Sequence, residues 1–180
     1  MASNSRRQIE SWLSTIDVSG SVLDVGGLFW PVKGRTKSWD VTDYKILDIK
    51  PSRNGVKADY VVDLNEGHRN VDNFDVAFCI EVADHFWDPV NAFCGISQMV
   101  RPGGTLYVSS NFMFPHHTGF DCVRLTSTGL TRILKFAMFN VVSIEPRKAV
   151  DDDLYKALSK ESKAVYHRGD IGYFVRAIRA

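Results

Sequence analysis

The chain has 180 residues, 44% of them apolar and 24% charged, and its 22 basic and 21 acidic residues give a formal net charge of +1. This balance argues against the basic surface of a nucleic-acid-binding protein and against a polybasic membrane anchor, and no apolar run approaches the roughly 18 residues of a membrane span. The length fits one domain, residues 1–180, with a sizeable core.

The first half of the chain begins with an expected helix and continues with strands. Residues 5–16 carry apolar side chains at helical spacing with polar residues between them, which predicts an amphipathic helix. Strands are then predicted at residues 21–25, 44–49, 58–64 and 74–80. The last of these, FDVAFCI, is the near-continuous apolar run typical of a strand covered on both faces of a parallel sheet.

The second half continues the alternation of helices and strands. Residues 90–100 have helical periodicity and stop at Arg-Pro-Gly-Gly, a helix-end and turn signal. The elements predicted after it are strand 105–109, helix 126–136, strand 141–144, helix 151–165 and strand 171–178. This order indicates an α/β fold, Rossmann-like and doubly wound. Its sheet is expected to be mainly parallel, with one antiparallel strand near the C-terminus and helices on both faces.

The stretch SVLDVGG (21–27) is typical of a strand that runs into a glycine turn, the usual start of a nucleotide pocket. Bulky Leu28, Phe29, Trp30 and Pro31 follow, where small residues would let a ligand approach the backbone. Neither GxGxxG nor GxxxxGK[ST] occurs, so a dinucleotide site is disfavoured and a P-loop is excluded. A ligand without phosphates makes fewer demands on such a turn.

Acidic residues stand at or near the ends of four successive predicted strands: Asp24, Asp48, Asp63 and Glu81. The carboxyl ends of parallel strands meet at one edge of a sheet, where ligands bind. A carboxylate there can accept hydrogen bonds from a ribose diol or an exocyclic amine, and an acidic rim suits a cationic sulfonium. Taken singly, each acid is better explained as a helix cap or a solvated turn residue, whereas four acids at one rim favour a nucleoside pocket.

Four segments carry a family resemblance: VLDVGG (22–27), the acid of ILDIKP (46–51), DYVVDLNE (59–66) and FDVAFCIEVADHFWDPVNAFCGISQMVRPGGTLYVSSNF (74–112). In this order they resemble the class I S-adenosylmethionine-dependent methyltransferases, in particular small type 11-like proteins. That family's pattern is VLDVGCGxG, a ribose-binding acid, then FDxVxxxEVLEHxxDPxxxLxxxxRxLKPGGxLxxS. Residues 74–110 match it almost position by position, and the resemblance covers roughly residues 20–135.

The resemblance implies S-adenosyl-L-methionine as the cofactor and assigns roles to ten residues. These are Asp24, Gly26, Gly27 and Leu28 at the methionine side, Asp48 at the ribose, Ile49 beside the adenine, Asp63 and Leu64 at the adenine edge, and Ile80 and Glu81 on the pocket floor. The chain departs from the family at Leu28-Phe29-Trp30, which replace the last residues of the glycine loop. Since only about ten residues separate Gly34 from the second predicted strand, the first helix is expected to be short.

The stretch HHTGFDCVRLTSTGL (116–130) resembles a subgroup of small methyltransferase-like proteins with the pattern HxxPxDxxRxTxxGLxxLL. Methyl transfer needs alignment, and a general base only where the acceptor is poorly ionised. The candidate catalytic residues are therefore His116 and His117, with Asp121 and Arg124 orienting the substrate or bracing the loop. Equally, the two histidines fit a surface or hydrogen-bonded structural role. Asp121 and Arg124, three apart, also fit a role in which they pair with each other or with backbone and fix the loop.

The resemblance divides the domain into four parts: a capping helix (1–18), a cofactor-binding core (20–110), a substrate-side loop (111–125) and a C-terminal helix–strand region (126–180). Its partner is expected to be a small-molecule methyl acceptor, with no nucleic acid and no membrane, and a homodimer is left open. Three widely spaced cysteines without a CxxC pair, and an N-terminus without a secretory signal, favour the cytoplasm. His116, His117 and Cys122 lack the spacing of a zinc ligand set, so no metal is expected.

Three functional hypotheses remain. The first is a methyltransferase that acts on O or N of a small molecule such as a sugar or secondary metabolite. The second is a non-catalytic relative that serves as a cofactor-binding or interaction module, favoured by the bulky residues after Gly27. The third, a nucleic-acid methyltransferase, is disfavoured by the near-neutral charge and the lack of an NPPY- or DPPY-type motif.

Overall fold

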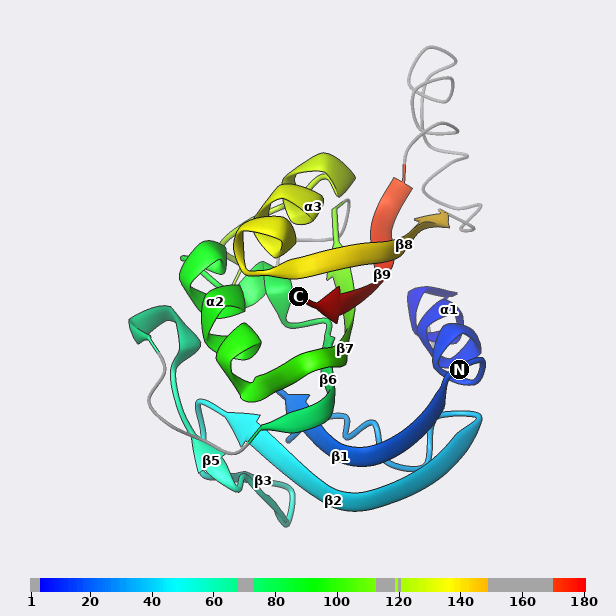
Figure 1. Cartoon of the computed structure of the whole chain (residues 1–180), viewed down its shortest axis with the longest axis vertical. Helices are drawn as coiled ribbons and strands as arrows, with labels where there is room; N and C mark the ends of the chain where they lie inside the picture. Colours follow the sequence, from blue (N-terminus) through cyan, green and yellow to red (C-terminus); the bar gives the residue numbers. More distant parts are fainter. Residues whose placement is uncertain (1–3, 68–72, 113–118, 120, 149–169) are drawn as a thin grey trace.

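A computed structural model describes residues 4–67, 73–112, 119, 121–148 and 170–180 of the chain. Its centre is a seven-stranded sheet in the order β5-β2-β1-β6-β7-β9-β8 (Figure 1). The strands are β1 (Asp17–Val25), β2 (Ser38–Asp48), β5 (Tyr60–Val61), β6 (Phe74–Ile80), β7 (Val100–Asn111), β8 (Phe139–Lys148) and β9 (Asp170–Arg179). A separate two-stranded hairpin, β3 (Ser52–Arg53) with β4 (Val56–Lys57), follows β2.

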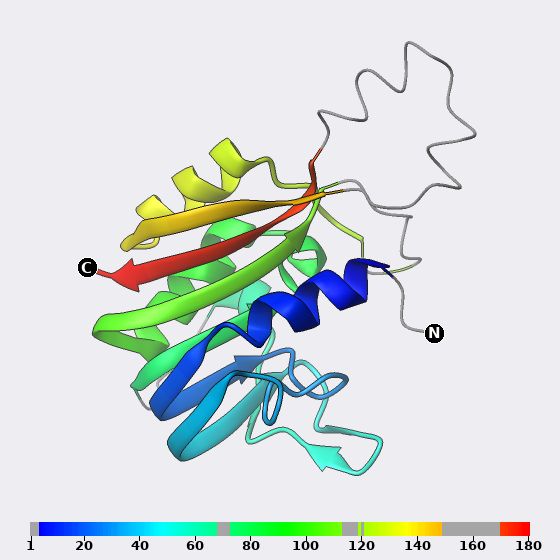
Figure 2. The same cartoon turned by 90° about the vertical axis from the view of Figure 1, so that its right-hand side faces the viewer.

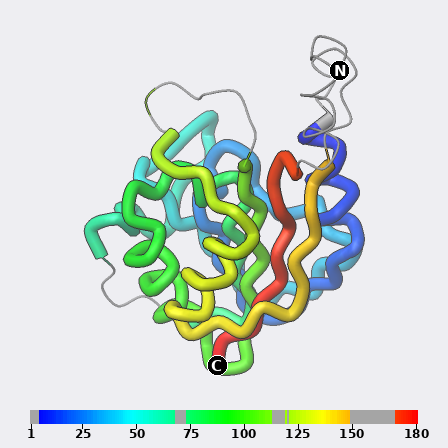
Figure 3. The backbone as a smooth tube through the Cα atoms, turned by 90° about the horizontal axis from the view of Figure 1, so that it is seen from above, coloured from blue at the N-terminus to red at the C-terminus, as the bar shows by residue number. Residues whose placement is uncertain are grey.

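The sheet is parallel from β5 to β7, and β9 runs antiparallel to both of its neighbours. Figure 3 shows β9, in red, between β7 and the orange β8. The predicted mainly parallel sheet with one antiparallel strand near the C-terminus is therefore confirmed. Strand order reverses at β1, which pairs with β2 on one side and β6 on the other, so a crevice is expected at the carboxyl ends of these strands.

Helices cover both faces of the sheet, as predicted. Helices α2 (Pro89–Met99) and α3 (Ser127–Phe136) lie on one face and α1 (Asn4–Leu13) on the other (Figure 2). The larger core cluster lies under α2 and α3, and a smaller one joins α1 to Val22 and Phe78 of the sheet. Two short 3-10 helices, η1 (Leu64–Glu66) and η2 (Ala83–His85), follow β5 and β6.

The two helices of the larger core begin at side-chain caps. Asp88 accepts a hydrogen bond from the Asn91 amide at 3.0 Å, and Pro89 occupies the first turn of α2, where its missing amide hydrogen costs nothing. Thr126 accepts from the Gly129 amide at 3.0 Å at the start of α3. Each cap leaves one fewer backbone donor unpaired at the helix N-terminus.

Several boundaries differ from those predicted. Strands β1 and β2 begin earlier than expected, and the strand predicted at 58–64 shortens to Tyr60–Val61 because Asp63 caps η1. The Arg-Pro-Gly-Gly signal does follow the end of α2, but it lies in β7, beside a register shift opposite Phe74 and Val76. The helix predicted at 151–165 lies outside the described residues.

The connection between β1 and β2 contains the largest departure. A short helix is predicted there, whereas residues 26–37, all of which the structure describes, form turns and bends without a helix. Pro31 removes a backbone donor from this segment, and the amide of Val32 donates to a side chain, Asp24 Oδ2, at 2.8 Å. The prediction of a short first helix is therefore wrong, and loop 26–37 takes its place.

Candidate functional site

A cavity of about 670 Å³ lies where the carboxyl ends of β1, β2 and β6 meet loop 26–37 and the start of α1. Apart from Gly27, every residue assigned to the cofactor from the sequence lines this cavity: Asp24, Gly26, Leu28, Asp48, Ile49, Asp63, Leu64, Ile80 and Glu81. The parallel sheet thus brings four acids from separate segments to one site. Other parts of the lining come from α1, the β3–β4 hairpin, and the residues around η2.

The two glycines after β1 are required by close packing. Gly26 has φ of +74°, and a Cβ added there would lie 2.4 Å from Val82 Cγ2. A Cβ on Gly27 would lie 2.5 Å from Asp24 Cγ. The glycine turn therefore lets Val82 and the Asp24 carboxyl approach the backbone, a close approach that only glycine permits.

Asp24 braces loop 26–37. Its carboxyl is buried, and its Oδ2 accepts hydrogen bonds from the Val32 amide at 2.8 Å and from the Tyr44 hydroxyl at 2.5 Å. Burial raises the pKa of Asp24 to about 6, although the Tyr44 and Val32 hydrogen bonds oppose this rise. Burial and the neighbouring Asp24 also raise the pKa of Tyr44, so the phenol remains a hydrogen-bond donor.

The bulky residues of loop 26–37 divide between the core and the cavity mouth. Leu28 is buried, whereas Phe29 and Trp30 are 49% and 55% exposed and line the cavity. The guanidinium of Arg53, from β3, lies 3.9 Å from the Phe29 ring centroid, and that of Arg6, from α1, lies 3.9 Å from the Trp30 ring. These cation–π contacts connect the loop to the elements on both sides of the mouth.

Asp48 and Asp63 have local backbone partners as well as positions in the cavity lining. Asp48 Oδ1 accepts from the Lys50 amide at 3.2 Å, and Asp63 Oδ1 accepts from the amide and the side-chain nitrogen of Asn65, both at 2.9 Å. The cap and turn roles considered for single acids are therefore present at both positions. Beside them, Ile49 leaves 53% of its surface exposed and provides an apolar wall.

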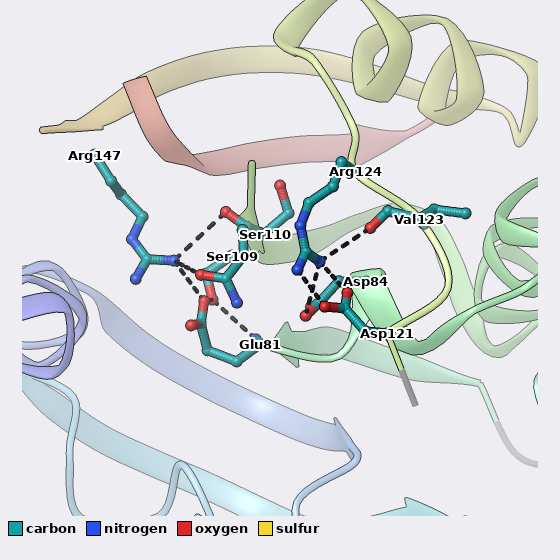
Figure 4. Close-up of polar contacts among 9 residues, drawn as sticks. Glu81, Asp84, Ser109, Ser110, Asp121, Val123, Arg124 and Arg147 are labelled. Atoms are coloured by element: carbon teal, nitrogen blue, oxygen red, sulfur yellow. Dashed lines mark hydrogen bonds and ion pairs between the residues drawn. The ribbon is translucent and has the colours of Figure 1, made fainter. Parts of the chain in front are cut away.

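Glu81 lies at the end of β6 in a left-handed conformation, with φ of +59°. Its Oε1 accepts from the Ser109 hydroxyl at 2.7 Å and from Arg147 Nη1 at 2.6 Å (Figure 4). Arg147, which the sequence reasoning missed, is fully buried. Tyr44, the partner of Asp24, was missed as well, and no residue pattern around either position signals its role.

Asp121 and Arg124 form an ion pair with each other, and Arg124 Nη1 lies 3.8 Å from Asp84 Oδ2 (Figure 4). Burial raises the pKa of Asp84, whose backbone carbonyl accepts from the Cys122 and Val123 amides. This cluster fixes residues 121–124 against η2. Neither Asp121 nor Arg124 lines the cavity, although Cys122 does, and His116 and His117 lie outside the described residues.

Two absences hold for the residues that the structure describes. No helix among them is long and apolar enough to cross a membrane. In the same part of the chain, no group of three or more His, Cys, Asp and Glu side chains is arranged to hold a metal ion.

Comparison with known families gives a match over part of the chain. The family model of the methyltransferase domain matches residues 50–108. A ubiquinone biosynthesis O-methyltransferase of Escherichia coli is 32% identical over 68 residues, which are 37% of this chain and 28% of that protein. The chain thus matches less than a third of the length of this curated relative.

Comparison with solved structures extends over nearly the whole chain. A chain from the complex between the Haloferax volcanii Trm112 methyltransferase activator and a methyltransferase has a TM-score of 0.69 at 16% identity, covering 96% of this chain and 88% of that one. The N-methyltransferase NodS of Bradyrhizobium japonicum, in complex with S-adenosyl-L-homocysteine, has a TM-score of 0.61 at 14% identity, with 97% and 86% covered. At these identities the likeness concerns the fold.

Proposed function

We propose that the chain is a class I S-adenosylmethionine-dependent methyltransferase that binds S-adenosyl-L-methionine and methylates O or N of a small molecule. The likeness of its fold to methyltransferase structures and the match of the methyltransferase-domain model over residues 50–108 support this proposal. The observation that carries the proposal is the cavity of about 670 Å³ with four acids from separate segments on its wall. Its volume is in the range of cofactor sites.

The chemistry of the lining fits a nucleoside that carries a cation and no phosphate. Asp48 would bind the ribose hydroxyls, because a carboxylate accepts from two adjacent donors. Ile49 and Leu64 would contact the adenine, and Asp63 would accept from its exocyclic amine. Glu81 would face the cationic methionine end, where a carboxylate favours positive charge.

When bound, the cofactor supplies an electrophilic methyl group: its S–CH₃ bond breaks as a C–O or C–N bond forms, the sulfonium becomes a thioether, and the acceptor releases its proton. The chain would mainly hold the acceptor in line with that bond. We assign the acceptor side to the loop 111–125, with His116 and His117 as candidate bases, and Asp121 and Arg124 as groups that brace the loop against η2.

Further proposals follow from the same assignment. The small-molecule acceptor would be a sugar or secondary metabolite. The chain would form a single domain of residues 1–180 in the cytoplasm, and a homodimer is left open. One of the similar proteins is an O-methyltransferase and another is an N-methyltransferase, which supports oxygen and nitrogen alike as acceptor atoms. The activator named with the Haloferax volcanii methyltransferase makes a protein partner a further outcome to test by mass in solution.

A second candidate function is a non-catalytic relative that serves as a cofactor-binding or protein-interaction module. One observation favours it: Asp24, expected at the methionine side, instead bonds Val32 and Tyr44, and Phe29 and Trp30 stand at the cavity mouth. Calorimetry distinguishes a chain that no longer binds the cofactor from an enzyme. A methyl-transfer assay distinguishes a chain that binds the cofactor without catalysis from an active enzyme.

The test of the proposed function is calorimetric binding of S-adenosylmethionine and S-adenosylhomocysteine to wild type, Asp48→Ala and Asp40→Ala. Asp40 is a matched control, since it is exposed on the same strand as Asp48 and outside the cavity lining. Loss of hydrogen bonds to a charged group should weaken binding roughly 10- to 100-fold in Asp48→Ala and leave Asp40→Ala unchanged. No binding by wild type, or equal losses in both variants, would overturn the proposal.

If wild type binds, transfer of a radiolabelled methyl group into fractionated metabolite extracts identifies the acceptor. Label in a small-molecule fraction supports the enzyme. The NMR chemical shift of the methyl group in the purified product then distinguishes an O-methyl from an N-methyl group. Tight binding with no transfer into any fraction would leave the cofactor-binding module as the function.

A further inference from the structure

Arg147 is a fully buried arginine whose side chain crosses part of the sheet. It belongs to β8, the outer strand, yet its guanidinium reaches the ends of β6 and β7. Gly172 of β9 lies opposite Arg147 in the register. A Cβ on Gly172 would lie 2.2 Å from the Ser110 carbonyl oxygen and 3.3 Å from Arg147 Cδ, so this glycine permits the close approach.

The guanidinium joins four elements. Nη1 donates to Glu81 Oε1 at 2.6 Å and to the Ser110 carbonyl at 3.4 Å (Figure 4). Nη1 also donates to Asn111 Oδ1 at 3.3 Å, and Nη2 donates to the Ser5 hydroxyl of α1. A fully buried arginine would be costly without such partners. The contacts gather at the cavity end of the sheet, where Ser5 and Glu81 both belong to the lining.

Glu81 uses its two carboxylate oxygens differently. Both bonds to its side chain, from Arg147 and from Ser109, end on Oε1, and no hydrogen bond from a described residue reaches Oε2. The side chain is 25% exposed and lines the cavity. Figure 4 shows the second oxygen turned away from the bonded one. A carboxylate fixed through one oxygen presents the other in a defined direction.

We propose that Arg147 is a positioning residue: it fixes Glu81 through Oε1 so that Oε2 accepts a hydrogen bond or a positive charge from the ligand in the cavity. The inference rests on the proposed function and specifies how one wall of that site is preorganised. The ordering of Glu81 exists before the ligand arrives, so binding loses less side-chain freedom than it would with a mobile carboxylate.

A double-mutant cycle separates this role from simple structural support. The variants are Arg147→Met, Glu81→Gln and the pair, with Lys148→Met as the control on the same strand, because Lys148 is exposed and pairs with Asp170 away from the cavity. The probe is S-adenosylmethionine, measured by calorimetry on the full chain. Glu81→Gln should weaken binding about tenfold through loss of charge.

Arg147→Met should weaken binding roughly two- to tenfold in the wild-type background, because Glu81 then loses its orientation. In the Glu81→Gln background the same change should have no effect or restore affinity, since a released glutamine can turn its oxygen to the ligand. Arg147→Lys should recover part of the loss. An equal loss in both backgrounds would overturn the proposal, because Arg147 would then act without Glu81.

Two further measurements keep the outcome decisive. Ser109→Ala removes the other bond to Oε1, so it should weaken binding in the same direction if Arg147→Met fails to fold. NMR order parameters of the Glu81 side chain, recorded without ligand, should fall in Arg147→Met and remain unchanged in Lys148→Met. Unchanged order refutes the positioning role whatever the binding data show. If wild type does not bind S-adenosylmethionine, the proposed function is refuted, and so is the role of Glu81 in binding the ligand. This holds even if the order parameters show that Arg147 restricts the Glu81 side chain.

Discussion

Replacing Asp24 with Asn measures how much free energy of unfolding the protein loses by burying a charged carboxylate beside loop 26–37. Both hydrogen bonds to the Asp24 carboxyl end on Oδ2, so the carbonyl oxygen of an asparagine can accept them in the same geometry. The substitution therefore removes the titration and keeps the two contacts with Val32 and Tyr44. Any cost of burying the asparagine amide is independent of pH and appears as a constant offset.

The sign follows from the direction of the shift. Burial raises the pKa of Asp24 from its ordinary 3.8 to about 6, so between these values the folded chain binds more protons at this site than the unfolded chain. Stability contributed by Asp24 therefore falls as pH rises from about 4 to about 6, and the loss is complete above that window. A shift of about two units corresponds to about 3 kcal/mol.

Urea unfolding of Asp24→Asn and wild type, measured from about pH 4 to about pH 7, should reveal this difference. The unfolding free energy of Asp24→Asn minus that of wild type should increase by roughly 2 kcal/mol over this range, most of it below about pH 6. Asp40→Asn, an exposed change on β2, should show a constant difference. A difference for Asp24→Asn that stays constant or decreases with pH would refute the buried, proton-binding carboxyl.

Two other substitutions test the same corner of the fold. Gly26→Ala places a methyl group 2.4 Å from Val82 Cγ2 at a φ of +74°. We expect the free energy of unfolding, measured in urea, to fall by about 2 kcal/mol or more, and Val82→Ala in the same chain to recover part of this loss. A neutral change would contradict the packing argument. Tyr44→Phe removes a hydrogen bond that lowers the pKa of Asp24, so the pKa should rise further and the destabilisation, about 1–2 kcal/mol, should be larger at about pH 8 than at about pH 5. Equal losses at both pH values would show that the phenol does not stabilise the charged carboxyl.

Elements with local signals were predictable from the sequence. Strand β6 was predicted with its observed bounds because FDVAFCI is a continuous apolar run. Helices α2 and α3 were predicted because their apolar residues recur at helical spacing. The gathering of Asp48, Asp63 and Glu81 at one cavity also followed, since the carboxyl ends of parallel strands share an edge.

Features that depend on tertiary packing were not predictable. Arg147 follows Pro146 on an edge strand, and its burial arises only when β9 pairs beside it and Gly172 leaves space for its side chain. The helix expected between β1 and β2 failed for a similar reason. The family resemblance implied a helix, and the length of the segment implied only that it is short, whereas the buried carboxyl of Asp24 supplies the hydrogen bond that fixes Val32 in a loop.

The position of Asp24 also changes how the acids of the cavity divide their roles. A buried carboxyl that already accepts from Val32 and Tyr44 contributes little charge to a ligand, particularly below the pKa of about 6. Under the proposed function, recognition of a cationic ligand would then depend on the exposed side of Glu81, and recognition of its sugar on Asp48. Substitution of Asp24 should therefore alter stability through loop 26–37, whereas substitution of Glu81 or Asp48 should alter affinity directly. Measuring stability and ligand affinity in the same set of variants distinguishes an acid that stabilises the structure of the site from one that binds the ligand.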